Sequence, residues 1–269
     1  MKPNKTILLF LQNLLRINGP GVTYKTFSIF FLGVLLIVLF TSSKIIRKKL
    51  VQFKAEDEIT VTANHYFSKK SSPYILLFHQ EGSSRGEYDS IAERFVKLGY
   101  NCLAVDLRSG QKFGYVENET AKSLLSSGKT AESLESLKDI KAAINYIWTL
   151  SGQSMILLGS SSSASLVLIE GKTNVHVKAI IAFSPGEYFR PALDMKSFLT
   201  DYPKKVFVGC SDQDFNYIQE MFSGMDGNNK IIFRPTFGSG SRGISALLRE
   251  NPTRDEYWLS LLIYFRSIR

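Results

Sequence analysis

Short, wholly apolar segments alternate with helical segments from residue 59 onward, and this alternation constrains the fold more than any other feature. Runs such as ILLF (75–78) and AIIAF (179–183) are typical of parallel strands that are buried on both faces. The pattern predicts an α/β fold, with a mostly parallel central sheet and helices on both faces. The expected strands are residues 59–67, 74–79, 101–106, 155–159, 179–184, 205–210 and 230–234.

Helices are expected between and after these strands, because apolar residues there recur at a spacing of three to four. Ser84 and Glu87 have the spacing of a capping box, followed by the apolar residues Tyr88, Ile91 and Phe95. A second apolar stripe covers residues 131–150. A third follows Thr253 and Glu256 near the end of the chain.

The charge of the chain is concentrated at its N-terminus. The 269 residues hold 33 Lys and Arg against 24 Asp and Glu, a formal net charge of +9. Residues 1–49 hold eight basic side chains and no acidic one, which leaves residues 50–269 with 25 basic and 24 acidic side chains. A nearly neutral domain argues against nucleic acid as a partner, since binding to phosphates requires a positive surface.

The basic segment flanks an uncharged run at residues 26–43, TFSIFFLGVLLIVLFTSS. As a helix, these 18 residues extend about 27 Å, close to the thickness of a bilayer core. A cleaved signal peptide is the alternative, but it would have a shorter apolar region and a cleavage site of small residues. We therefore expect a basic tail at 1–25, one transmembrane helix at 26–43, a basic linker at 44–58 and an α/β domain at 59–269.

Basic residues near the run predict its orientation. Two lie within about fifteen residues on its N-terminal side and five on its C-terminal side, so the positive-inside rule places the domain in the cytoplasm as part of a single-pass membrane protein. Cys102 and Cys210 lack metal-ligand spacing, and two unpaired structural cysteines agree with a reducing compartment.

Residues 155–165, MILLGSSSSAS, are the strongest functional signal. A buried strand runs into Gly159, then small residues, then a helix-compatible segment. This is the context of a nucleophile elbow, in which small neighbours let a tight turn project a serine above the sheet. The spacing makes Ser161 the nucleophile, with Ser163 where the motif has glycine. A serine-rich turn that only caps a helix is the alternative.

Several segments together resemble an α/β-hydrolase of the dienelactone-hydrolase-like or acyl-esterase-like kind. They are LLFHQEGSSRGEYDSIAERFVKLGYNCLAVDLRSG (76–110), the elbow, SPGEYF (184–189) and VFVGCSDQD (206–214). The resemblance covers residues 58–269 and implies an oxyanion hole from the backbone N–H groups of Gln80 and Ser162. It implies that the catalytic acid is Asp214, with Asp212 as the alternative.

The histidine of such a triad is missing. The segment RGISAL (242–247) resembles a His-Gly-x-x-Ala-Leu segment, with Arg242 where the histidine is expected. The chain has three histidines, His65, His79 and His176, all of which precede Asp214. Arginine stays protonated and cannot act as a base. Loss of the histidine reduces the rate of a serine triad by about 10⁶-fold.

These observations predict a degenerate hydrolase that acts as a binding or scaffolding module. The alternative is an active hydrolase of carboxylic esters or thioesters, with Ser161 activated by an unusual base such as His79. The expected partners are the membrane and either a small acyl ligand or a protein. No motif for a nucleotide, metal or other cofactor is present.

Overall fold

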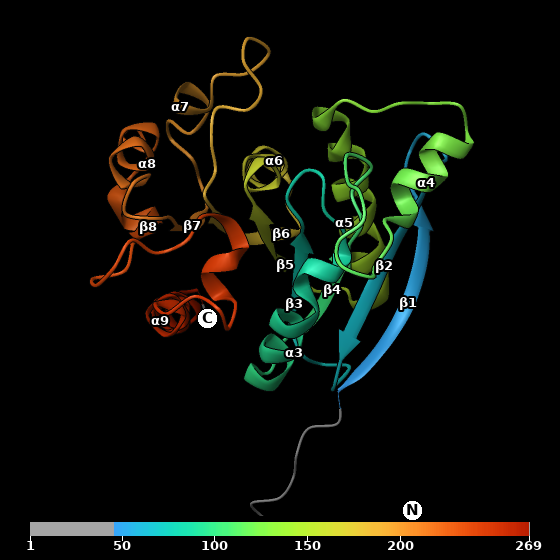
Figure 1. Ribbon diagram of the computed structural model, residues 1–269, viewed down its shortest axis with the longest axis horizontal. Coiled ribbons are helices and arrows are strands. Elements are labelled where there is room, and N and C mark those ends of the chain that lie inside the picture. The colour runs from blue at the N-terminus through green and yellow to red at the C-terminus, as the bar shows by residue number, and fades with distance from the viewer. Residues whose placement is uncertain (1–45, 269) are drawn as a thin grey trace, which may run out of the picture. The chain divides into compact units, whose positions relative to one another are not determined.

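The structure is a computed structural model that describes residues 46–268. Its centre is an eight-stranded sheet with the strand order β1-β2-β4-β3-β5-β6-β7-β8 (Figure 1). Strands β3 to β8 are parallel to one another, and β2 is antiparallel to both β1 and β4. The strands are β1 (Arg47–Lys54), β2 (Thr60–Phe67), β3 (Tyr74–Phe78), β4 (Asn101–Val105), β5 (Met155–Ser160), β6 (Val177–Phe183), β7 (Lys205–Gly209) and β8 (Lys230–Phe233).

Helices cover both faces of the sheet (Figure 1). Helices α3 and α9 pack on one face, and α5, α6 and α8 pack on the other. The α-helices are α3 (Asp89–Leu98), α4 (Glu119–Ser126), α5 (Leu137–Ser151), α6 (Ser162–Thr173), α7 (Met195–Phe198), α8 (Phe215–Met221) and α9 (Arg254–Ser267). Short 3₁₀ helices are Arg85–Tyr88, Ser133–Ser136, Gly227–Asn229 and Gly243–Leu247.

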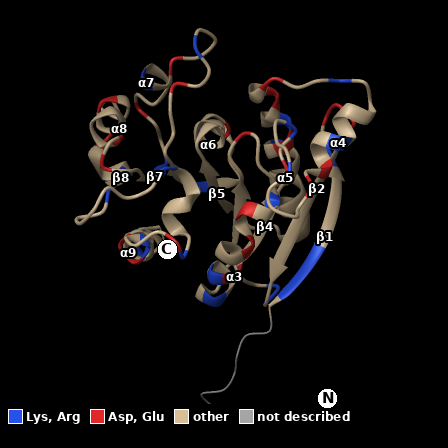
Figure 2. Ribbon diagram, in the orientation of Figure 1, with Lys and Arg blue, Asp and Glu red and all other residues tan. Residues whose placement is uncertain are grey.

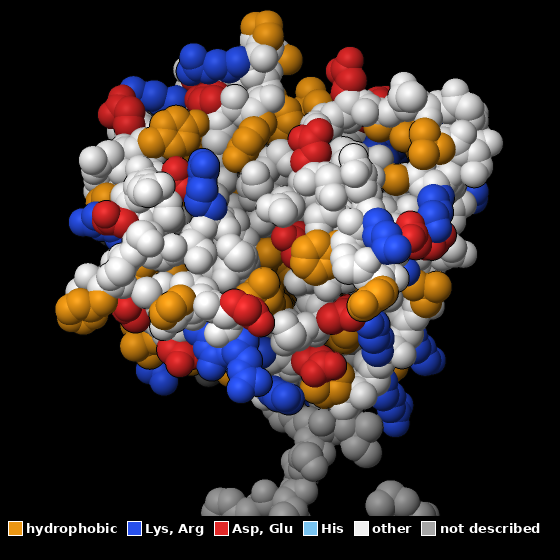
Figure 3. Space-filling view, viewed as in Figure 1, with side chains coloured by type: hydrophobic (Ala, Val, Ile, Leu, Met, Phe, Trp, Pro, Cys, Tyr) orange, Lys and Arg blue, Asp and Glu red, His pale blue; other side chains and the backbone are white. Residues whose placement is uncertain are grey.

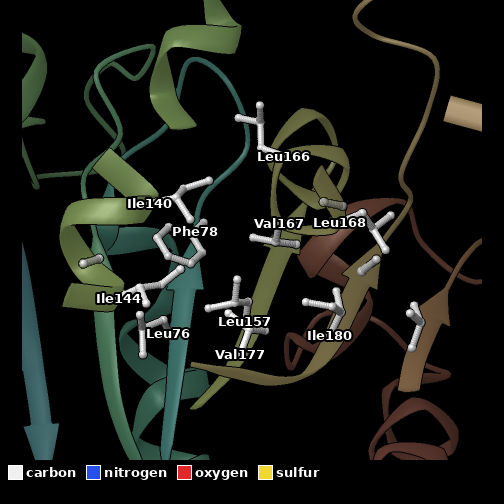
Figure 4. Close-up of a cluster of buried hydrophobic side chains, with 14 of the residues drawn as sticks. Leu76, Phe78, Ile140, Ile144, Leu157, Leu166, Val167, Leu168, Val177 and Ile180 are labelled. Atoms are coloured by element: carbon white, nitrogen blue, oxygen red, sulfur yellow. The ribbon is translucent and has the colours of Figure 1, made fainter. Parts of the chain in front are cut away.

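Strand β3 shows why the central strands are apolar throughout. Leu76 and Phe78 point into the core beneath α5 and α6, whereas Ile75 and Leu77 point into the core beneath α3 and α9. Successive side chains of a strand face opposite sides, so a strand covered on both faces needs apolar residues at every position. Figure 4 shows Leu76 and Phe78 packed with Leu157 of β5, Ile144 of α5 and other members of the first core.

The seven expected strands are all present, and their bounds differ by one or two residues. The expected linker at 44–58 differs more, because residues 47–54 form β1 and pair antiparallel with β2 over eight positions. This strand lies at the edge of the sheet, and none of its residues is buried. Charged residues therefore occupy it, and it lacks an apolar run.

The expected transmembrane segment at 26–43 lies outside the described residues. Within residues 46–268, no helix is long and apolar enough to cross a bilayer.

A buried ion-pair network joins the segment after β4 to α5 and to the β1–β2 turn. Arg108, which follows β4, contacts Asp139 of α5 at 2.8 Å and Asp57 of the β1–β2 turn at 2.6 Å. The side chains of Arg108 and Asp139 are almost completely buried. The network therefore ties the β1–β2 hairpin to α5.

Candidate active site

Ser161 occupies a strained turn between β5 and α6. Its backbone has φ 56° and ψ −123°, a region that a residue with a side chain rarely adopts. The turn is tight, because a Cβ atom on Gly159 would lie 2.4 Å from the carbonyl oxygen of Ser163. Ser161 is partly exposed, so its hydroxyl is held at the carboxyl end of the parallel strands.

Ser163 fits the place where an elbow motif has its second glycine. Its hydroxyl donates to the carbonyl of Phe78 at 2.7 Å and accepts from the N–H of Ser160 at 2.9 Å. These hydrogen bonds join the elbow to β3. A small polar residue therefore replaces glycine here without leaving a buried hydroxyl unsatisfied.

The hydroxyl of Ser161 lies 3.0 Å from the phenol oxygen of Tyr188, within hydrogen-bonding distance. Tyr188 belongs to the segment after β6, which the helix of the elbow holds in place. Ser165 of α6 accepts from the N–H of Gly186 at 3.0 Å and donates to its carbonyl at 2.8 Å. A Cβ atom on Gly186 would lie 2.9 Å from the Tyr188 ring, so glycine lets the ring fold back over the turn.

Sequence reasoning identified the segment 184–189 but gave Tyr188 no role. The only signal was the glycine two residues before an aromatic residue, and that pair has no distinctive spacing. The contact with Ser161 depends on how α6 and this segment pack, which the local sequence does not reveal.

Asp214 and Arg242 form an ion pair. Arg242 Nε lies 2.9 Å from Asp214 Oδ2, and the same carboxylate oxygen accepts from the hydroxyl of Ser211 at 2.9 Å. The Asp214 side chain is 17% exposed, whereas Arg242 is 72% exposed. The other candidate acid, Asp212, is half exposed and pairs with Arg234. The structure therefore brings Asp214, rather than Asp212, to Arg242.

The segment that carries Arg242 is fixed to the carboxyl ends of β5 and β6. The hydroxyl of Ser184 accepts from the N–H of Gly243 at 2.8 Å, and the hydroxyl of Ser160 accepts from the N–H of Ile244 at 2.9 Å. Gly243 has φ +61°, and a Cβ atom there would lie 2.8 Å from the Ser160 hydroxyl. These contacts place the backbone of Arg242 beside the elbow.

His79 is fully buried at the end of β3, and backbone groups engage both of its ring nitrogens. Nδ1 lies 2.7 Å from the carbonyl of Gln80, and Nε2 accepts from the N–H of Leu107 at 2.9 Å. Burial lowers the pKa of His79 to about 4, so the ring is neutral at physiological pH. The ring is therefore held between the segments that follow β3 and β4.

The other two histidines have contacts away from the elbow. His65 lies on β2 within 3.1 Å of the Tyr74 hydroxyl, and burial lowers its pKa to about 4. His176 stacks on Trp148, with ring centroids 3.9 Å apart.

The two expected oxyanion-hole donors differ in their surroundings. Ser162 is the first residue of α6, and the first N–H groups of a helix have no partner within the helix. The N–H of Gln80 instead donates to the buried carboxyl of Glu87 at 3.1 Å. Burial raises the pKa of Glu87 to about 7. Glu87 was expected to complete a capping box with Ser84, but its side chain reaches the segment after β3.

A small cavity of about 240 Å³ lies next to the ion pair between Arg242 and Asp214. It is lined by Asp214, Arg242, Tyr217 and the segment from Ser184 to Tyr188. Its volume is below the usual range for sites that bind drug-sized molecules. Among residues 46–268, no group of three or more His, Cys, Asp or Glu side chains is placed to hold a metal ion.

Solved structures resemble this arrangement over most of the chain. An esterase from Pyrococcus furiosus has a TM-score of 0.60 and 14% identity, over 82% of this chain and 90% of the esterase. A dienelactone hydrolase from Anabaena variabilis has a TM-score of 0.61 and 15% identity, over 83% of this chain and 98% of the other. An esterase from Pyrobaculum calidifontis has a TM-score of 0.60 and 12% identity, over the full length of both.

One class of α/β protein combines a mostly parallel sheet, helices on both of its faces and a serine at a tight turn between a strand and a helix. The described domain has all three features. With these structural relatives, the described domain has the α/β-hydrolase fold. No protein-family model and no curated protein sequence matches the chain.

Proposed function

We propose that the protein is a membrane-anchored, degenerate hydrolase that acts as a binding or scaffolding module. The observation that carries this proposal is the 2.9 Å ion pair between Arg242 and Asp214. In a serine triad, the acid orients a histidine that takes the proton of the nucleophile. Here the acid pairs with a guanidinium group, which has no acceptor atom and cannot take the proton of a nucleophile.

The chemistry of Ser161 supports the same proposal. A serine hydroxyl is a weak nucleophile unless a base lies beside it. The Ser161 hydroxyl lies within hydrogen-bonding distance of the Tyr188 phenol, while both ring nitrogens of His79 contact backbone groups. A serine triad without its base loses about 10⁶-fold in rate.

The ligand that suits the cavity is a short acyl compound with a carboxylate. The cavity is small, and the Arg242 guanidinium at its wall has five N–H donors, of which Nε faces Asp214. A carboxylate bound by the remaining donors would lie in the cavity that Arg242 lines together with Tyr188 and Tyr217. Titration with butyrate, monitored by calorimetry, tests this assignment, and Arg242→Gln is expected to abolish binding while Arg234→Gln retains it.

An active serine hydrolase is the second candidate, and the backbone of Ser161 favours it. The strained φ of 56° is what an elbow needs to expose a nucleophile, and strain of this kind is usually found at functional sites. In this alternative, Ser161 attacks a carboxylic ester or thioester with the help of an unusual base.

A fluorophosphonate probe on the detergent-solubilised full chain separates the two candidates. The degenerate site predicts only trace labelling over hours, at the level of Ser161→Ala. Stoichiometric labelling that is lost in Ser161→Ala and kept in Ser239→Ala would establish the active hydrolase and overturn the degenerate reading.

Anchoring through residues 26–43 is the other part of the proposal. The uncharged run has the length of a bilayer span, and the excess of basic residues on its C-terminal side supports a cytoplasmic domain. The test is alkaline carbonate extraction of membranes that contain the full chain. Retention in the membrane pellet is expected, and release into the supernatant would exclude the anchor.

A further inference from the structure

The described domain is nearly neutral, but its charge is strongly polarised. We call the edge of the sheet where the parallel strands begin the amino edge. It consists of residues 46–49, 68–73, 97–100, 150–154, 174–178, 201–205, 226–230 and 265–268. These segments hold eleven Lys and Arg but only two Asp, a net charge of +9. The rest of residues 46–268 holds sixteen basic and twenty-two acidic side chains, a net charge of −6.

The basic side chains of this edge come from elements that are far apart in the sequence. Lys49 is on β1, Lys69 and Lys70 are in the β2–β3 turn, Lys178 is on β6 and Arg266 is at the end of α9, and all five are exposed. Figure 2 shows basic residues on the lower parts of β1 and α3, and Figure 3 shows basic side chains along β1 at the lower right. The fold therefore gathers them on one edge.

Large apolar side chains are exposed on the same edge. Val175 is 82% exposed in the α6–β6 turn, Leu150 is 45% exposed at the end of α5, and Leu98 is 38% exposed at the end of α3. Leu98 also borders a hollow of about 620 Å³, whose wall includes Tyr100, Phe265 and Ile268. Aliphatic side chains among lysines suit a lipid interface, whereas phosphates of nucleic acid offer them nothing to contact.

The chain enters the domain at this edge. Strand β1 begins at Arg47, next to the end of β2 (Figure 1). The uncharged run at 26–43 ends only three residues before Ile46, and three residues of extended chain span about 10 Å. If the run crosses a bilayer, the start of β1 at the amino edge is therefore within about one Debye length of the lipid headgroups.

We propose that the amino edge lies against the surface of a bilayer that contains anionic lipids. Its exposed basic side chains, among them Lys69, Lys70 and Lys178, face the headgroups. Leu98, Leu150 and Val175 enter the interface. The proposal rests on the proposed anchor for proximity, while charge and exposed apolar residues support the contact independently.

This contact would determine which ligands reach the candidate site. Ser161 lies at the carboxyl end of β5, the opposite end of the sheet from the amino edge. Strands of five to seven residues separate the two edges by about 20 Å. A ligand of the site would therefore come from the aqueous phase, and membrane lipids would be out of reach.

Depth-dependent fluorescence quenching tests the proposal on the full chain in lipid nanodiscs. Cys102 and Cys210 are fully buried, so a maleimide dye reacts selectively with a new surface cysteine. Ser71→Cys places the dye at the amino edge, and Ser239→Cys places it beyond β8 at the carboxyl edge. The nanodiscs contain 30% phosphatidylglycerol and a lipid with a quencher on its headgroup. We expect the dye on Ser71→Cys to be quenched at least three times as strongly as the dye on Ser239→Cys.

Charge reversal provides the matched control. The triple variant Lys69→Glu, Lys70→Glu and Lys178→Glu is expected to lose at least half of the quenching at position 71. Lys112→Glu, Lys122→Glu and Lys129→Glu change the net charge equally, away from this edge, and should leave it unchanged. Equal quenching at both positions, or no effect of the first triple variant, would overturn the proposal.

Failure of the anchor gives a different result from failure of the contact. If alkaline carbonate releases the chain from the membrane, flotation of the same full chain with vesicles measures binding of the amino edge to lipid without the anchor. Binding to phosphatidylglycerol vesicles that the first triple variant loses would then support the contact without the anchor. Absence of binding would refute the contact.

Discussion

The carboxyl group of Glu87 accepts a hydrogen bond from the backbone N–H of Gln80, with 3.1 Å between oxygen and nitrogen. The resemblance to α/β-hydrolases predicts that this N–H group is a donor for an oxyanion. Here a buried side chain of the same domain accepts its hydrogen bond. The contact would hold the segment after β3 in one conformation and would compete with any bound oxyanion for the N–H group.

Replacement of Glu87 is expected to change how stability depends on pH. Burial raises the pKa of Glu87 to about 7 from its ordinary 4.5. Between these values the folded state holds more protons than the unfolded state, so this group lowers stability as the pH rises from 4.5 to 7. The neutral side chain of Glu87→Gln lacks this effect. Relative to the wild type, the variant should therefore gain about 3 kcal/mol between pH 4.5 and pH 8.

Urea denaturation of both proteins at several pH values measures that difference. The comparison with the wild type is necessary, because the lowered pKa values of His65 and His79 make their own contribution to stability rise with pH. Glu93→Gln is a suitable control, since Glu93 is exposed on α3. A constant difference between Glu87→Gln and the wild type from pH 4.5 to pH 8 would show that Glu87 ionises at its ordinary pKa.

Arg242→His is expected to restore part of a serine triad. The backbone of Arg242 is fixed beside the elbow through Gly243 and Ile244, and Asp214 is in contact with its side chain. An imidazole at this position would have Asp214 to orient it and could accept the proton of Ser161. We expect at least tenfold faster fluorophosphonate labelling than in the wild type. Arg242→Ala removes the ion pair without adding a base and should not produce this gain.

Adding Asp214→Asn to Arg242→His distinguishes a restored triad from a merely opened pocket. The double variant should lose most of the gain, because the imidazole would lack its orienting carboxylate. If Arg242→His labels no faster than Arg242→Ala, position 242 does not correspond to the triad histidine in geometry.

Tyr188 is expected to limit access to Ser161. Its phenol lies 3.0 Å from the serine hydroxyl, and the segment is held by two hydrogen bonds between Gly186 and Ser165. In the Arg242→His background, Tyr188→Ala should increase the labelling rate further by several-fold. Tyr217→Ala should not, because the Tyr217 hydroxyl accepts from the N–H of Glu187. Equal effects of the two substitutions would show that Tyr188 does not cover the serine.

The positions of seven strands along the chain and the two-sided burial of the central ones were predictable because they follow from local patterns. Apolar runs such as 75–78 are typical of strands covered on both faces, and the small residues around Ser161 favour a tight turn. Strand β1 was missed, because the charged residues of an exposed edge strand lack that pattern. Pairing with β2 makes it a strand, and pairing is a long-range property.

The contacts of individual side chains in the site depend on tertiary packing and were less predictable. Glu87 has the spacing of a capping residue, yet it bonds to Gln80 because the turn after β3 returns to the start of the 3₁₀ helix. Tyr188 meets Ser161 through the packing of the segment after β6 on α6. Sequence spacing identified the elements that carry these residues, but it did not identify their partners.

Ser160 connects the elbow strand to the segment of Arg242, and its loss is expected to weaken both stability and site geometry. Its buried hydroxyl accepts from the N–H of Ile244 at 2.9 Å. Ser160→Ala leaves that N–H without its partner, which costs about 1–3 kcal/mol in unfolding free energy. Ser245→Ala is the control, because the exposed Ser245 hydroxyl donates to a carbonyl of the same segment and should cost less than 0.5 kcal/mol, about the effect of an ordinary surface substitution. The same hydrogen bond is expected to help position Arg242. The gain of labelling in Arg242→His should therefore fall when Ser160→Ala is added, while circular dichroism shows that the double variant is still folded. An unchanged gain would mean that Ser184, through the N–H of Gly243, fixes the segment without help from Ser160.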